Sequence, residues 1–121
     1  MDKKMILVVD DDVDLLKMLK LRIESEGHEF ISAKDGQEMI KAMKENKPDL
    51  IILDVMLPRM DGYSALREVR TEDDFKDIPV IVLTAKEKKK MEDLFALEKI
   101  AFFIEKPFET NDLLSKIRNL L

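Results

Sequence analysis

The distribution of apolar and polar residues along the chain predicts an alternation of strands and helices. Short apolar runs of strand length occur at 5–9, 29–33, 49–54, 78–84 and 101–104. Each run precedes a segment whose apolar residues recur at helical spacing, at 12–27, at 36–48, around Leu66 and Val69, at 87–99 and at 109–121. Gly27 and Pro48 mark the ends of the first two helices. The pattern therefore predicts five consecutive strand–helix units.

Helical spacing also predicts which side chains face the core. These are Val13, Leu16, Leu19, Ile23, Met39, Ile40, Met43, Leu66, Val69, Met91, Leu94, Phe95, Leu113, Leu114, Ile117, Leu120 and Leu121. The runs at 5–9, 49–54 and 78–84 lack the alternation of a strand with one solvated face. We therefore expect helices to cover both faces of these strands, as in a parallel sheet.

The predicted fold class is α/β. Right-handed crossovers between parallel strands give a doubly wound, flavodoxin-like (βα)5 fold, with a five-stranded sheet of order 2-1-3-4-5 and helices on both faces. An eight-stranded βα barrel needs about 200 residues or more, and this chain has 121. The barrel is therefore excluded by length.

Composition narrows the classes of function. The 121 residues, 45% of them hydrophobic, supply enough apolar surface for one domain spanning 1–121. The absence of cysteine excludes disulfides, thiolate metal sites and cysteine nucleophiles. A net charge of -5 with interspersed signs gives no basic stripe, so we expect no direct binding of nucleic acid. With neither a bilayer-spanning apolar run nor a signal-peptide pattern, we expect no membrane association and a cytoplasmic location.

Candidate chemistry lies in polar residues at the ends of the predicted strands. Asp10 and Asp11 follow the first strand, Asp54 ends the third, Thr84 ends the fourth and Lys106 follows the fifth. In a doubly wound sheet, ligands bind beyond the carboxyl ends of the strands, where the strand order switches direction. Two carboxylates about 5 Å apart repel by roughly 3 kcal/mol at an effective dielectric constant near 20. We therefore expect a cation there, and an all-oxygen donor set favours Mg²⁺.

Four segments carry a family resemblance. "ILVVDDD", "LIILDVMLPRMDG", "VIVLTA" and "FIEKPF", in this order and spacing, resemble the receiver domain of two-component response regulators over essentially the whole chain. The resemblance implies that Asp54 accepts a phosphoryl group from a phosphohistidine of a sensor histidine kinase or a histidine phosphotransferase. It also implies that Asp11, Asp54 and the backbone carbonyl of Met56 bind Mg²⁺ directly, while Asp10 acts through water.

The same resemblance assigns roles on the other side of the site. Thr84 is expected to hydrogen-bond a phosphoryl oxygen, Lys106 to pair with its charge, and Phe103 to be the aromatic switch residue. The bond from Lys106 to Pro107 resembles the family's cis peptide. The chain would then be a phosphoacceptor regulator that catalyses its own phosphoryl transfer and autodephosphorylation. Its change of conformation near strands 4 and 5 would regulate a protein target bound to the face of helix 4, strand 5 and helix 5.

Other interpretations of these residues stay open at this point. Asp11 or Asp12 can cap the first helix, and Thr84 with Glu87 matches a capping box. A phosphohydrolase of the haloacid dehalogenase type would use Asp10 and Asp12, but 121 residues leave no room for its usual cap insertion. A binding module that ignores phosphate is a third possibility.

Three further expectations concern domain organisation and single residues. We expect a standalone receiver without an output domain, either binding a target or serving as a phosphorelay intermediate, although an excised domain of a longer regulator is equally compatible. Asp61 and Gly62 should form a turn that enters the third helix, and His28 should lie at the surface without a metal role. The segment "KIAFF" is more apolar than in many receivers, and its Phe103 lacks the hydroxyl of the common tyrosine.

Overall fold

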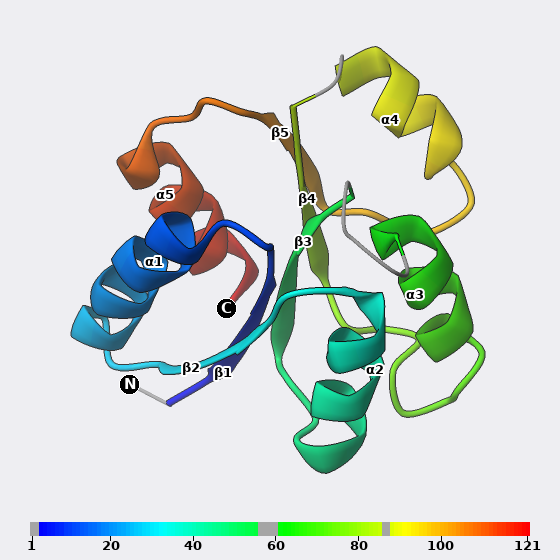
Figure 1. The fold of residues 1–121 in the computed structure, drawn as a ribbon, viewed down its shortest axis with the longest axis horizontal. Helices are drawn as coiled ribbons and strands as arrows, with labels where there is room; N and C mark the ends of the chain where they lie inside the picture. Colours follow the sequence, from blue (N-terminus) through cyan, green and yellow to red (C-terminus); the bar gives the residue numbers. More distant parts are fainter. Residues whose placement is uncertain (1–2, 56–60, 86–87) are drawn as a thin grey trace.

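Strands and helices alternate along the chain in the computed structural model, which describes residues 3–55, 61–85 and 88–121. Within these ranges the strands are β1 (Met5–Val9), β2 (Glu29–Ala33), β3 (Leu50–Asp54), β4 (Val80–Thr84) and β5 (Phe102–Glu105). The helices are α1 (Val13–Ser25), α2 (Gly36–Glu45), α3 (Gly62–Arg70), α4 (Lys88–Leu94) and α5 (Thr110–Leu120). The strands form one parallel sheet of order β2-β1-β3-β4-β5, which confirms the predicted fold (Figure 1).

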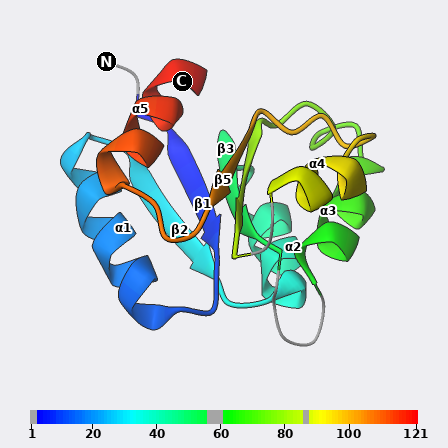
Figure 2. The same cartoon turned by 90° about the horizontal axis from the view of Figure 1, so that it is seen from above.

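Helices cover both faces of the sheet. Helices α1 and α5 lie on one face and α2, α3 and α4 on the other (Figures 1 and 2). Successive strand residues point to opposite faces, so Ile6 and Val8 of β1 pack with α1 and α5, whereas Leu7 and Val9 pack with the α2–α4 layer. The central strands therefore serve two apolar clusters at once. This double burial explains why their sequences read as continuous apolar runs.

Aspartates at helix starts satisfy backbone donors that have no partner inside the helix. The carboxylate of Asp12 accepts hydrogen bonds from the N–H groups of Asp14 and Leu15 at the start of α1. The carboxylate of Asp61 accepts from the N–H of Ser64 at 2.7 Å at the start of α3. The predicted role of Asp61 in helix entry is confirmed, and the cap of α1 is Asp12 rather than Asp11.

Three predicted core positions were wrong, and all three lie at helix ends. Val13 is 47% exposed because it is the first residue of α1, and Leu121 is exposed because it follows the last residue of α5. Leu94 is 43% exposed because the buried row of α4 runs through Met91 and Phe95, four residues apart. Ile40 and Leu120 are half-buried, but each packs against one of the two clusters, so their predicted orientation is confirmed.

Helix α4 is also shorter than the predicted segment 87–99, since it ends at Leu94. Residues 95–98 form turns, and Lys99 then adopts a positive φ of 50°, which a helix cannot contain. The other boundaries differ from the prediction by up to three residues, as is usual at element ends. Among the described residues, none of the helices has the length and apolar character needed to cross a membrane.

Candidate functional site

Three carboxylates meet at the carboxyl edge of the sheet. Val9 of β1 pairs with Leu53 of β3, so the residues that follow each of them, Asp10 and Asp54, lie side by side. Carboxylate oxygens of Asp10, Asp11 and Asp54 all lie within 4.8 Å of one another. Asp10 and Asp54 are buried, whereas Asp11 is exposed. The predicted convergence of these residues is confirmed, and the cluster opens to solvent on the Asp11 side.

The amine of Lys106 sits between two of these carboxylates. Its Nζ donates to Oδ2 of Asp10 at 2.7 Å and to Oδ2 of Asp54 at 3.1 Å. The loop after β5 carries this residue, and its backbone N–H donates to the carbonyl oxygen of Thr84 at 2.7 Å, which ties the loop to the end of β4. The lysine predicted to reach this edge therefore contacts two members of the acidic cluster directly.

Opposing effects act on the pKa of Lys106. Burial alone would lower the pKa of this amine, but the hydrogen bonds to Asp10 and Asp54 and their negative charges outweigh burial and raise it above its ordinary value of 10.5. The group is therefore an ammonium ion at neutral pH. Because the folded-state pKa is raised, its contribution to stability is fully present below pH 10.5 and is lost as the pH rises through the folded-state value.

The three consecutive aspartates after β1 have three different surroundings. Asp10 uses both carboxylate oxygens, since Oδ1 accepts the N–H of Asp12 at 2.9 Å and Oδ2 accepts Lys106. Asp12 caps α1, and Asp11 lies exposed beside the cluster. The alternative in which Asp10 and Asp12 form an Asp-x-Asp catalytic pair gains no support, because the Asp12 carboxylate serves the helix.

Gly62 fixes the main chain that carries Asp54. A Cβ at position 62 would lie 2.6 Å from the backbone oxygen of Asp54 and 3.0 Å from Cδ1 of Leu53. The N–H of Gly62 also donates to the carbonyl of Val55 at 3.1 Å. Helix α3 thus begins directly against the end of β3. Sequence reasoning assigned Gly62 to a turn and missed this contact, because close approach of two backbones is a tertiary property.

The other predicted site residues come from β4, β5 and the loop after β5. Thr84 is buried and follows Leu83, the β4 partner of Asp54, so it ends its strand at the same edge. Phe103 is half-buried on β5. The cis peptide bond between Lys106 and Pro107 is present as predicted. Met56 and the alternative capping role of Glu87 lie outside the described residues.

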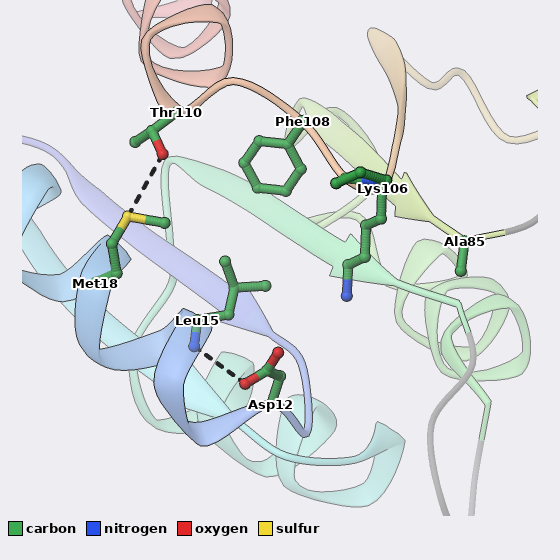
Figure 3. Close-up of a pocket in the computed structure, with 8 residues that line it drawn as sticks. Asp12, Leu15, Met18, Ala85, Lys106, Phe108 and Thr110 are labelled. Atoms are coloured by element: carbon green, nitrogen blue, oxygen red, sulfur yellow. Dashed lines mark hydrogen bonds between the residues drawn. The ribbon is translucent and has the colours of Figure 1, made fainter.

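A pocket of about 470 Å³ adjoins the acidic cluster, between α1 and the loop that leads from β5 to α5 (Figure 3). Figure 3 shows Lys106 extending from that loop, with Asp12 at the start of α1, Leu15 on α1, and Phe108 and Thr110 on the α5 side. The hydroxyl of Thr110 lies 3.7 Å from Sδ of Met18, across the pocket. The pocket therefore gives the acidic edge an open approach with apolar walls.

The donor set of the cluster fits a hard divalent cation. Every ligand atom offered by the three aspartates is a carboxylate oxygen, and all lie close enough together to share one ion. His28 lies at the other end of β1, where its Nδ1 accepts the N–H of Lys4 at 3.2 Å. His28 was predicted to lie at the surface, but its side chain is half-buried. The three aspartates therefore suit Mg²⁺ better than a zinc-type ion, which prefers nitrogen and sulfur ligands.

Comparison with known proteins gives a consistent result. A family model described as "Response regulator receiver domain" matches residues 6–118. The probable transcriptional regulator ycf27 of Cyanophora paradoxa is 39% identical over 121 residues, which cover 99% of this chain and 49% of the relative. This chain spans about half the length of the curated relatives it matches.

Solved structures share the fold over nearly the whole chain. The chemotaxis protein CheY4 of Vibrio cholerae superposes with a TM-score of 0.91 and 26% identity, covering 99% of this chain and all of the other. The response regulator protein TrrA of Thermotoga maritima, solved in complex with Mg(2+)-BeF, has a TM-score of 0.83 and 31% identity, covering 98% of this chain and 99% of the other.

Proposed function

The chain belongs to the response regulator receiver domain family of two-component signalling, and from this premise we propose that Asp54 is its phosphoacceptor. Receiver domains accept phosphoryl groups from histidine kinases and act as phosphorylation-dependent signalling modules. The observation that carries the proposal is the cluster of Asp10, Asp11 and Asp54 with the amine of Lys106 bonded between two of them. Such a site balances negative charge with a movable cation.

Asp54 is the best nucleophile of the three aspartates. Asp10 is completely buried and both of its oxygens accept hydrogen bonds, one of them from the backbone. Asp11 is exposed at the start of the loop, without a strand to hold it. Asp54 ends a strand that is buried along its whole length, and Gly62 packs against its backbone, so its carboxylate is held in a fixed position. A fixed carboxylate beside an ammonium group suits in-line attack on phosphorus.

We assign Mg²⁺ to this cluster. Asp11, Asp54 and the backbone carbonyl of Met56 would bind the ion directly, and Asp10 through water. When bound, the ion would offset negative charge on the transferring phosphoryl group and on its leaving group. The all-oxygen donor set and the Mg(2+)-BeF complex of the Thermotoga relative support this assignment.

The protein's own residues account for the transfer. A carboxylate oxygen of Asp54 attacks the phosphorus of a phosphohistidine on a sensor kinase or a histidine phosphotransferase; the new O–P bond forms as the N–P bond breaks, and the imidazole leaves. The ammonium of Lys106 then pairs with the phosphoryl charge, and the hydroxyl of Thr84 donates to a phosphoryl oxygen. Attack of water on phosphorus then forms a new O–P bond as the bond to Asp54 breaks, which releases inorganic phosphate and returns Asp54 to its free carboxylate.

The conformational change that regulates a partner would follow from the negative charge of the phosphoryl group on Asp54. A phosphoryl group adds a charge of about -1.5 to -2 at the edge, which draws Lys106 and Thr84 towards Asp54. The backbone N–H of Lys106 donates to the carbonyl oxygen of Thr84, which joins the ends of β4 and β5. Movement of these two residues therefore favours a second packing of Phe103 on β5. A protein target would then bind the face of α4, β5 and α5.

The test measures phosphoryl uptake by mass. Incubation with acetyl phosphate and Mg²⁺ should add the mass of one phosphoryl group to the wild-type protein. Asp54→Asn should abolish the addition because an amide oxygen is a poor nucleophile, and chelation of the metal should abolish it in the wild type. Asp73→Asn is a matched control, since the Asp73 side chain is 96% exposed in the loop after α3. Undiminished uptake by Asp54→Asn, or none by the wild type, would refute the proposal.

A further inference from the structure

Three aromatic rings from separate elements form a row beneath the surface. Phe95, directly after α4, lies between Tyr63 of α3 and Phe103 of β5. The ring centroids are 5.1 Å apart for Tyr63 and Phe95 and 6.1 Å apart for Phe95 and Phe103, with interplanar angles of 85° and 65°. Both contacts are edge-to-face, the preferred geometry for aromatic pairs. Phe95 is nearly completely buried, so each neighbour limits its position.

One face of α3 holds the first ring of this row. Tyr63, Arg67 and Arg70 follow one another at intervals of four and three residues, which places them on the same side of the helix. The guanidinium of Arg67 lies 5.7 Å from the centre of the Tyr63 ring, and its Nε lies 3.8 Å from Oε1 of Glu98. The face of α3 that contacts Phe95 therefore also reaches Glu98, three residues further along.

Arg70 fixes the same segment through backbone carbonyls. Its Nη1 donates to the carbonyl oxygens of Phe75, Lys76 and Ile78 at 3.0, 2.9 and 2.8 Å. Its Nη2 donates to the carbonyl oxygen of Glu98 at 3.4 Å. The end of α3 thus holds both the loop that leads to β4 and the connection from α4 to β5. A shift of the backbone at Glu98, three residues after Phe95, relative to α3 would strain the last of these contacts.

The other end of the row is the aromatic residue of β5. Phe103 is half-buried and has no hydroxyl, so packing alone sets the position of its ring. Interiors are close-packed, and a displaced ring leaves a void unless its neighbour follows. The neighbour in contact here is Phe95. A change in the packing of Phe103 is therefore transmitted to a buried ring that α3 holds from the other side.

From this arrangement we infer that Phe95 is a positioning residue that couples Phe103 to α3, so that the phosphorylation state of Asp54 is also registered at Tyr63. The inference rests on the proposed function, because it needs the Phe103 ring to respond to the phosphoryl group. The conformational response to phosphorylation would then reach beyond β5 to the face of α3 that carries Tyr63 and Arg67.

Tyrosine fluorescence gives a direct readout. The chain contains one tyrosine and no tryptophan, so its tyrosine emission reports on position 63 alone. Adding Mg²⁺ with beryllium fluoride, a phosphoryl mimic, should change the emission of the wild-type protein, because the groups packed on the ring set its quenching. Phe95→Leu should lose most of this change while still taking up phosphoryl from acetyl phosphate, as read by intact mass. Phe103→Leu should lose it as well.

Two further variants make the result specific. Phe30→Leu, the same substitution on β2 in the opposite apolar cluster, should keep the full emission change. Phe95→Met, which keeps more apolar volume, replaces Phe95→Leu if circular dichroism shows that the leucine variant is unfolded. An undiminished emission change in a folded Phe95 variant overturns the inference. So does a constant wild-type emission when fluorine NMR shows bound beryllium fluoride. Failure to bind beryllium fluoride or to take up phosphoryl at all overturns the proposed function, and this inference with it.

Discussion

The two helical layers that cover the sheet are held together by different means. Between α1 and α5, Arg118 donates two hydrogen bonds to the carboxylate of Glu26, at 3.0 and 2.6 Å, and Arg22 donates to Asn111 at 2.8 Å. On the other face, the edge-to-face contact of Tyr63 with Phe95 and the hydrogen bond from Arg70 to the carbonyl of Glu98 join α3 to the segment that follows the short helix α4. The first layer joins helices of 13 and 11 residues, whereas α4 has seven.

The difference identifies the layer that can rearrange at lower cost. Leu94 at the end of α4 is substantially exposed, Leu97 is 94% exposed, and Lys99 has a left-handed backbone conformation. Segments with few buried apolar contacts open with the smallest free energies. The α4 side is also the side into which β4 leads from Thr84. The more weakly packed helix, α4, thus lies next to the carboxyl edge of the sheet, where we propose that phosphorylation of Asp54 adds negative charge.

The largest predicted effect comes from making the same substitution, leucine to alanine, once in each helical layer. Leu19 is completely buried on α1, so Leu19→Ala should lower the free energy of unfolding by about 3 kcal/mol, through lost burial and a cavity. Leu94→Ala on α4 should lower it by less than about 1 kcal/mol, because the side chain is already partly solvated. Urea denaturation measures both. Equal losses would contradict the comparison.

A smaller effect, of opposite sign, concerns the strained residue after α4. Lys99 has a φ of 50°, a conformation that costs a residue with a Cβ roughly 1–2 kcal/mol. Lys99→Gly should relieve that cost but make the unfolded chain more flexible. The net expectation is a gain of about 0.5–1 kcal/mol in urea denaturation. A loss of stability would show that the lysine side chain contributes more than its backbone costs.

The smallest effect concerns the pair that joins α1 to α5. The hydrogen bond from Arg118 lowers the pKa of Glu26 below its ordinary value of 4.5. Since this folded-state pKa is depressed, the pair's contribution is present above pH 4.5 and is lost as the pH falls through the folded-state value. Glu26→Gln should therefore be slightly less stable than the wild type at pH 7 in low salt, and the difference should vanish in acid and shrink in high salt. A difference that persists in acid would point to packing rather than charge.

Sequence reasoning succeeded where burial was complete. The runs in β1, β3 and β4 and the polar residues at their carboxyl ends, Asp10, Asp54 and Thr84, could be placed because these strands are buried between helices and their ends meet at one edge of the sheet. It failed at the end of α4, where Met91, Leu94 and Phe95 keep helical spacing but the helix ends at Leu94 and turns lead to the left-handed backbone of Lys99. The close approach at Gly62 and the ring contacts of Phe95 depend on three-dimensional packing, which a one-dimensional pattern does not contain. The expected cytoplasmic location and the standalone organisation stay predictions.

The ammonium group of Lys106 affects how the unphosphorylated site would bind a metal ion. A tethered side chain already neutralises part of the negative charge at Asp10 and Asp54. A divalent ion bound at the proposed site would compete for these carboxylates with an amine whose local concentration is fixed by its attachment. Readiness to receive a phosphoryl group would then depend on the concentration of free Mg²⁺ around the protein.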